Sequence, residues 1–119
     1  MSVSEGFRSF VLEQLARTMP RLRARNMFGG VGLYCGDIFF ALMDDDVLYF
    51  KVDDATRPRF EERGMGPFRP GGEGGEVMQY YEVPPDVLED AEALAPWAQD
   101  AVEVGRRARV RKRPPGRGA

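Results

Sequence analysis

The sequence predicts an α+β fold, in which helices cover one face of an antiparallel sheet to form a two-layer sandwich. Apolar stripes with helical spacing near both ends of the chain indicate the helices. Alternating apolar segments, joined by short turns between residues 27 and 52, indicate the sheet. The expected order of elements is α-β-β-β-α-β-β-α, and the 119 residues suit a single domain.

The first helix is predicted over residues 3–18. Its apolar stripe, with the i, i+3, i+4, i+7, i+8 spacing of one buried face, consists of Phe7, Phe10, Val11, Gln14 and Leu15. Ser2 and Glu5 have the spacing of a capping box, and Ser4 is an alternative N-cap. Pro20 ends the helix because proline lacks an N–H and clashes with the preceding turn.

Three strands are predicted next, as an antiparallel meander. In the first, over residues 27–35, alternation assigns one face to Met27, Gly29, Val31, Leu33 and Cys35, and the other to Phe28, Gly30, Gly32 and Tyr34. Glycines inside a strand indicate a bulge or the close packing of a large side chain above them. Gly36-Asp37 suits a hairpin turn, and the strands 38–43 and 47–52 follow, joined by a turn at 44–46.

The second half predicts a short helix over 54–63, ended by Gly64, and then a glycine-rich loop over 65–76. A weak strand is expected at Phe68 and a clearer one over 77–83. The last helix is expected to have Pro96 in its first turn, with a stripe of Leu94, Trp97, Ala98, Ala101 and Val102. Gly105 weakens this helix, and the arginine-rich segment beyond it is expected to be either helical or frayed. The folded domain is predicted over residues 1–105 and a basic, disordered tail over 106–119.

Charge is unevenly divided along the chain. Residues 1–105 hold 10 basic and 19 acidic groups, whereas the last 14 residues hold seven basic groups and no acid. The seven are Arg106, Arg107, Arg109, Arg111, Lys112, Arg113 and Arg117. Such a split is typical of an interaction arm, which binds nucleic acid, pairs with the acidic body of its own chain, or binds an acidic partner.

Composition argues against several chemistries. The chain has no histidine and one cysteine, which leaves no Ser-His-Asp triad, internal disulfide or thiolate metal cluster. The glycines at 29–32 lack the spacing and lysine of a phosphate loop, and the aspartates at 44–46, 53 and 54 lack a calcium-loop pattern, so turns and caps are expected there. We expect no cofactor, metal, catalytic residue or membrane association, a cytoplasmic location, and an apolar packing role for Cys35.

Five blocks of sequence, at 26–34, 40–42, 48–53, 80–84 and 94–98, together resemble the TfoX N-terminal domain family. The residues that carry the resemblance include Met27, Phe28, Gly29, Gly30, Gly32, Tyr34, Lys51, Tyr81, Pro84 and Trp97. The resemblance implies an α+β sandwich and a role like that of the competence regulators also called Sxy, which act as transcriptional co-regulators beside a DNA-binding activator. It implies no enzymatic activity. By fold analogy with secretion chaperones it also raises the expectation of a homodimer.

The leading hypothesis is therefore a small cytoplasmic, non-enzymatic regulatory or adaptor domain that acts by binding a protein. The alternative is a nucleic-acid-binding protein that uses the arginine-rich tail. Because Tyr80 and Tyr81 point to opposite faces of a strand, one of them is expected to be exposed as a contact for a partner.

Overall fold

The computed structural model describes residues 3–27, 29–70 and 79–112, and the side chains of this last segment as far as Val110. In chain order its elements are α1 (Glu5–Ala16), β1 (Leu22–Met27), β2 (Gly30–Cys35), β3 (Ile38–Asp44), β4 (Val47–Lys51), α2 (Arg57–Glu62), β5 (Tyr80–Glu82), α3 (Pro85–Leu88) and α4 (Ala91–Lys112). The predictions for Ser2, Phe28, the glycines at 71–75, the start of the strand at 77–78 and residues 113–119 lie outside the described residues.

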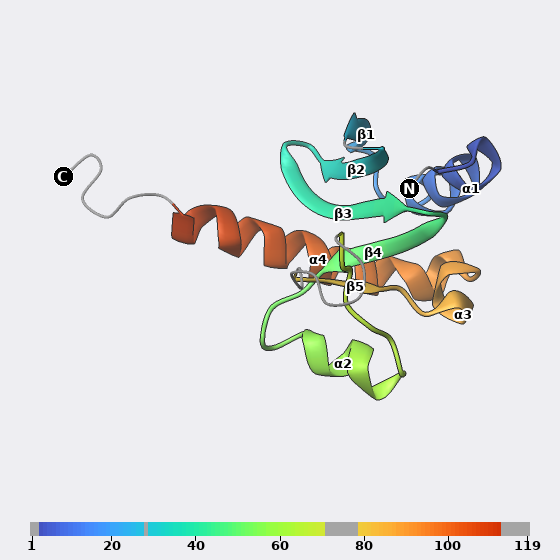
Figure 1. Cartoon of the computed structure of the whole chain (residues 1–119). Coiled ribbons are helices and arrows are strands. Elements are labelled where there is room, and N and C mark those ends of the chain that lie inside the picture. The colour runs from blue at the N-terminus through green and yellow to red at the C-terminus, as the bar shows by residue number, and fades with distance from the viewer. Residues whose placement is uncertain (1–2, 28, 71–78, 113–119) are drawn as a thin grey trace.

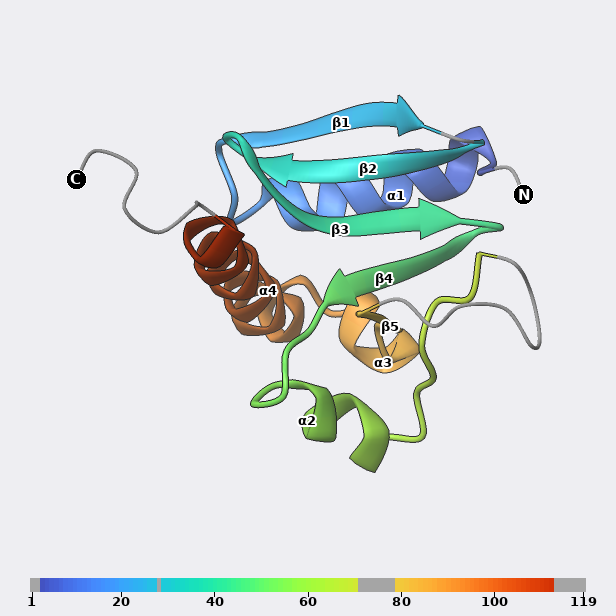
Figure 2. The same ribbon diagram turned by 60° about the vertical axis from the view of Figure 1, so that its left-hand side comes forward.

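The five strands form one sheet in the order β1-β2-β3-β4-β5, and every neighbouring pair is antiparallel. Each strand therefore pairs with the next along the chain, as Figures 1 and 2 show. The turn between β3 and β4 places Asp45 and Asp46 at φ 53° and 58°, a conformation that suits a tight hairpin. The predicted α+β class with an antiparallel sheet is confirmed.

One face of the sheet holds the hydrophobic core. Leu33, Phe40 and Phe50 on this face are fully buried against α1 and α4. From α1 the core takes Val11 and Leu15, as its stripe predicts, while Phe10 of the same stripe is 37% exposed. Ser4 caps α1 by accepting a hydrogen bond from the Phe7 N–H at 3.2 Å. The helices thus cover one face, and in the described part of the chain no helix covers the opposite face of the sheet (Figure 2).

The residues of the strand predicted over 27–35 belong to two strands. Met27 is the last residue of β1, an edge strand that the sequence did not predict, and residues 30–35 form β2. Gly29, at φ +83°, turns the chain between them. The turn breaks the alternation, so Met27 lies on the same face as Gly32 and not, as predicted, with Val31 and Leu33. The register between β2 and β3 shifts between Leu33 and Tyr34, and the extra residue there is Phe40 of β3, not one of the strand glycines at which a bulge was predicted.

The weak strand expected at Phe68 is present as a short pairing with β5. The Phe68 N–H donates to the Tyr80 carbonyl at 2.7 Å, and the Glu82 N–H donates to the Gly66 carbonyl at 3.0 Å. Gly64, at φ +77°, ends α2 as predicted, because a left-handed residue there satisfies the last carbonyls of the helix.

Helix α4 is longer than the sequence predicts. It begins at Ala91, where the Asp90 carboxylate accepts the N–H groups of Glu92 and Ala93, so Pro96 lies in its second turn. The helix then continues past Gly105 to Lys112, and the domain boundary predicted at Gly105 falls inside it. A Cβ on Gly105 would lie 2.7 Å from the carbonyl oxygen of Phe39. The glycine therefore marks the place where α4 crosses β3, and residues 106–112 belong to the folded helix.

Candidate functional site

The sheet face opposite the helices carries a row of aromatic rings. Tyr34 stacks on Phe39 with ring centroids 5.1 Å apart, and Phe39 contacts Tyr80 at 5.7 Å. The Lys51 ammonium lies 4.9 Å from the centre of the Tyr80 ring, a cation–π distance. Since both tyrosines of β5 are buried, at 5% and 8% exposure, the expectation that Tyr80 or Tyr81 is exposed is wrong.

An apolar groove of about 460 Å³ lies on this face. The residues that line the open-face groove are Met27, Gly30, Val31, Phe39, Leu42, Met43, Asp44, Phe68, Pro70 and Tyr80. Glycine at position 32 helps to form it: a Cβ there would lie 2.5 Å from the Met27 Cε atom and 3.1 Å from the Phe39 ring. The predicted packing of a large side chain over a strand glycine is confirmed at this position.

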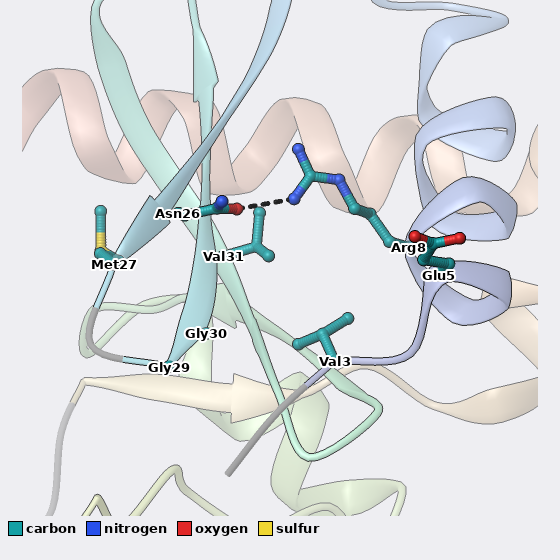
Figure 3. A pocket seen from close by; sticks show the side chains of 8 residues that line it. All are labelled: Val3, Glu5, Arg8, Asn26, Met27, Gly29, Gly30 and Val31. Carbon is teal, nitrogen blue, oxygen red and sulfur yellow. Dashed lines mark hydrogen bonds between the residues drawn. The ribbon is translucent and has the colours of Figure 1, made fainter.

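A second hollow, of about 670 Å³, adjoins the groove at the turn between β1 and β2 (Figure 3). It shares Met27, Gly30 and Val31 with the groove and is completed by Val3, Glu5, Arg8, Asn26 and Gly29. Figure 3 shows Arg8 reaching from α1 towards β1, where its Nη1 donates to the Asn26 Oδ1 at 2.7 Å. The β1–β2 turn therefore lies between the apolar open-face groove and the second, more polar hollow.

Two phenols of the open face, those of Tyr49 and Tyr80, have a pKa above the usual value and are held in their neutral form. Burial raises the pKa of Tyr80 far above its usual value, and the neighbouring Tyr34 adds to the effect. The pKa of Tyr49 is also raised, first by burial and then by the charges of Glu82, Asp44 and Asp45. These three carboxylates disfavour a further negative charge on the Tyr49 phenol.

The residues that carry the family resemblance divide into two groups. Met27, Gly29, Gly30, Gly32, Tyr34 and Lys51 all lie at the turn or on the open face. The others support α2 and the core: the Tyr81 hydroxyl donates to Glu61 at 3.1 Å, the Trp97 ring meets Phe60 edge-on at 4.9 Å, and Pro84 is fully buried.

Three arginines of the predicted tail pair with carboxylates of the same chain. Arg106 contacts Glu103 at 3.4 Å, Arg107 contacts Asp53 at 2.8 Å and Arg109 contacts Asp37 at 2.9 Å. For these residues the predicted alternative of a tail that pairs with the acidic body is confirmed. The side chains of Arg111 and Lys112 lie outside the described part of the structure, as do Arg113 and Arg117.

Sequence reasoning missed a second basic group at the start of β1. Arg21 and Arg23 converge on the Gly36-Asp37 turn, where the Arg23 Nη1 donates to the Gly36 carbonyl at 3.2 Å. A signal was available, because residues 14–36 contain four arginines and no acidic residue. The excess of acidic groups over residues 1–105 as a whole concealed this local basic stretch.

The aspartates have the turn and capping roles that the sequence predicts. Asp53 accepts the N–H groups of Ala55 and Thr56 at 3.1 and 3.0 Å, while Asp45 and Asp46 form the β3–β4 turn. Within the residues that the structure describes, no three His, Cys, Asp or Glu side chains are grouped to hold a metal ion. In that same part of the chain, no helix is both long and apolar enough to cross a membrane. Cys35 is half-buried and packs against the core.

These features define a class: a small α+β domain whose sheet is backed by helices on one face and grooved on the other. The chain belongs to the TfoX N-terminal domain family, whose model matches residues 13–105. Over 67 residues it is 37% identical to the DNA transformation protein TfoX1 of Aliivibrio fischeri (strain ATCC 700601 / ES114). That stretch covers 56% of this chain and 30% of the relative, so the chain matches less than one third of the relative's length.

Proposed function

We propose that this chain is a cytoplasmic, non-enzymatic regulatory domain related to competence, and that it acts by binding a protein in the open-face groove. The relative's name, a DNA transformation protein, supports the competence setting. The observation that carries the proposal is the groove itself, because the residues of the family resemblance at the β1–β2 turn and on β2 gather around it.

The lining of the groove favours binding over catalysis. Among the described residues that line the groove, Asp44 and Tyr80 are titratable, and burial holds the tyrosine neutral. A nucleophile needs an adjacent base within hydrogen-bonding reach, and the other described lining side chains are apolar. Exposed apolar grooves with a polar rim are typical of partner-binding surfaces.

The lining also defines the chemistry of the partner. The described lining is mainly apolar, so a partner segment that presents apolar side chains is complementary to the groove. A second copy of the chain is the competing occupant, and light scattering of the purified protein distinguishes the two.

Site-specific crosslinking tests the proposal. A photo-reactive side chain placed at Leu42, inside the groove, is compared in cells with one at Phe10, which is exposed on α1. We expect a protein captured from position 42 alone, whose purified form binds the wild-type chain and loses at least tenfold in affinity for Leu42→Arg. Phe10→Arg, the matched control, leaves that affinity unchanged. Equal capture from both positions, or an affinity that Leu42→Arg does not change, would contradict the proposal.

A further inference from the structure

Arginines from two distant parts of the chain meet at the hairpin turn between β2 and β3. Arg21 and Arg23 come from the entry into β1, and Arg109 comes from the last turns of α4. The Gly36 N–H donates to the Arg21 carbonyl at 2.9 Å, and a Cβ on Gly36 would lie 2.7 Å from the Arg21 Nη2 atom. Arg109 Nη1 lies 2.9 Å from the Asp37 Oδ2. The turn thus holds three guanidinium groups close together.

Two of these groups, from Arg21 and Arg109, line a hollow of about 320 Å³ together with Arg106. We call it the arginine hollow. Arg106 and Arg109 are about half exposed, at 54% and 49%. Among the described residues that line the hollow, Asp37 is the only carboxylate. One ion pair uses a fraction of the five N–H donors of a guanidinium, so the arginines keep donors for a further anion.

We propose that the arginine hollow, together with Arg23, which donates to the Gly36 carbonyl of the adjoining turn, binds the phosphate backbone of double-stranded nucleic acid. Guanidinium groups match phosphate oxygens in geometry and form bidentate hydrogen bonds with them. In the sequence, Arg111, Lys112 and Arg113 follow closely after Arg109, so basic residues continue along the chain. A polymer with regularly repeated negative charges is complementary to such a surface.

The lining favours a duplex over a single strand. Proteins that bind single strands stack the bases on aromatic side chains, and no described residue that lines the arginine hollow is aromatic. The position of the hollow also separates it from the proposed protein-binding groove. β2 begins at Gly30 beside the groove and ends at Cys35 beside the hollow, so the two surfaces lie at opposite ends of this strand.

Fluorescence anisotropy with a labelled 24-base-pair DNA duplex, measured on the full chain between 50 and 200 mM salt, tests the proposal. If Arg21, Arg23, Arg106 and Arg109 each contact one phosphate, affinity falls on the order of 100-fold across this range. Arg21→Gln/Arg23→Gln removes two contacts, so the slope of log affinity against log salt becomes shallower by about 1.8. At 100 mM salt the double variant binds at least about tenfold more weakly.

Two further variants complete the experiment. Asp37→Asn removes the one carboxylate that lines the described hollow, so we expect severalfold tighter binding, a gain that misfolding does not produce. Arg59→Gln/Arg63→Gln is the matched control, because it removes one exposed arginine from α2 and one from its C-cap and leaves the hollow intact. This control is expected to bind DNA as the wild type does.

Several outcomes would overturn the proposal. One is the absence of DNA binding at 50 mM salt, and another is unchanged binding by Arg21→Gln/Arg23→Gln, which would assign the affinity to other residues. A single strand of the same length that binds more tightly than the duplex would overturn the preference for a duplex. Poly-glutamate that displaces the DNA at equal charge concentration would instead indicate an acidic protein as the occupant.

Discussion

Arg107, near the end of α4, donates a hydrogen bond from its Nη2 to the Asp53 Oδ2 at 2.8 Å, and 54 positions of sequence separate the two residues. Asp53 also caps the turn that leads into α2 through the N–H groups of Ala55 and Thr56. The pair therefore links the basic end of the chain to the acidic body at the end of β4. It holds the last turns of α4 against the domain.

The first prediction concerns the pH dependence of this link. Burial opposes ionisation of Asp53, but hydrogen bonds from Arg107 and Thr56 outweigh it and hold the pKa of the carboxyl below its usual value. A hydrogen bond from Arg109 and the charge of that residue lower the pKa of Asp37 as well. A lowered folded-state pKa contributes stability above the unfolded-state value, and this contribution is lost as the pH falls through the folded-state value.

We therefore expect the free energy of unfolding, measured in urea, to fall between pH 6 and pH 3, and to fall less in Arg107→Gln. The difference is under about 1 kcal/mol, because exposed ion pairs contribute little to stability. Arg63→Gln, which breaks an ion pair between α2 and α3, is the control for loss of one charge. If Arg107→Gln and the wild type show the same decrease, the carboxylate of Asp53 is not linked to Arg107 in solution.

The second prediction concerns Gly105. Glycine in a helix is less favourable than alanine by about 1 kcal/mol, so helix propensity alone favours Gly105→Ala. The structure predicts the opposite sign, since the new Cβ would lie 2.7 Å from a backbone oxygen of Phe39 that cannot rotate away. We expect a loss of about 1–3 kcal/mol in the free energy of unfolding, as for other overpacked sites.

Gly6→Ala is the matched control, because Gly6 lies in α1 and a Cβ there would meet nothing within 4 Å. That variant is expected to gain up to about 1 kcal/mol in stability from helix propensity. Parallel urea denaturation of the two variants gives the answer. A stabilised Gly105→Ala protein would show that α4 does not cross β3 this closely.

The close approach of α4 to β3 at Gly105 could not be predicted from the sequence. Periodicity reports burial, and it predicted correctly that Val11, Gln14 and Leu15 of α1 share a buried face. It missed β1 because Arg23 and Arg25 are exposed on an edge strand that has few β-branched or aromatic residues. A close approach between α4 and β3 depends on tertiary packing, and nothing local to Gly105 indicates it.

The sequence predicted only part of the candidate site, because the rest depends on tertiary packing. The glycines at 30 and 32 indicated close packing, but the turn at Gly29 places Met27 on the other face of the sheet, and alternation cannot show that. The arginine hollow joins residues about 70 to 90 positions apart, so no window of sequence contains it. Only the meander and the length of α4 bring them together.

The third prediction concerns the contact between α2 and α4. Phe60 is 4% exposed and meets the ring of Trp97, the only tryptophan, edge-on, while the Arg59 guanidinium lies 5.1 Å from the same ring. Phe60→Leu leaves a gap beside the indole and is expected to cost about 1–2 kcal/mol. Tryptophan emission should shift to longer wavelength as water reaches the ring. Arg59→Gln leaves the Phe60–Trp97 contact in place, so we expect it to cost less stability than Phe60→Leu. A larger loss in Arg59→Gln would contradict this prediction.

The last prediction compares the two glycines beside the open-face groove. A Cβ on Gly30 would lie 2.5 Å from the Met43 carbonyl oxygen, and a Cβ on Gly32 would lie equally near the Met27 Cε atom. The backbone oxygen in a strand cannot move without loss of sheet pairing, whereas the thioether has three rotatable bonds and can turn aside. We therefore expect Gly30→Ala to cost about 1–3 kcal/mol in unfolding free energy and Gly32→Ala less than about 1.5 kcal/mol.

The two variants also differ in what they do to the groove. Gly32→Ala displaces the Met27 methyl group from its place beside the Phe39 ring, so the ¹³C-methyl resonance of Met27 should lose its ring-current shift while the fold is retained. The same displacement alters the groove lining, and binding of a groove partner should weaken although stability is nearly unchanged. Gly30→Ala should lower stability first. If Gly32→Ala is the more destabilised protein, or if its Met27 resonance does not move, Met27 does not cross β2 at Gly32 and the groove has a different lining.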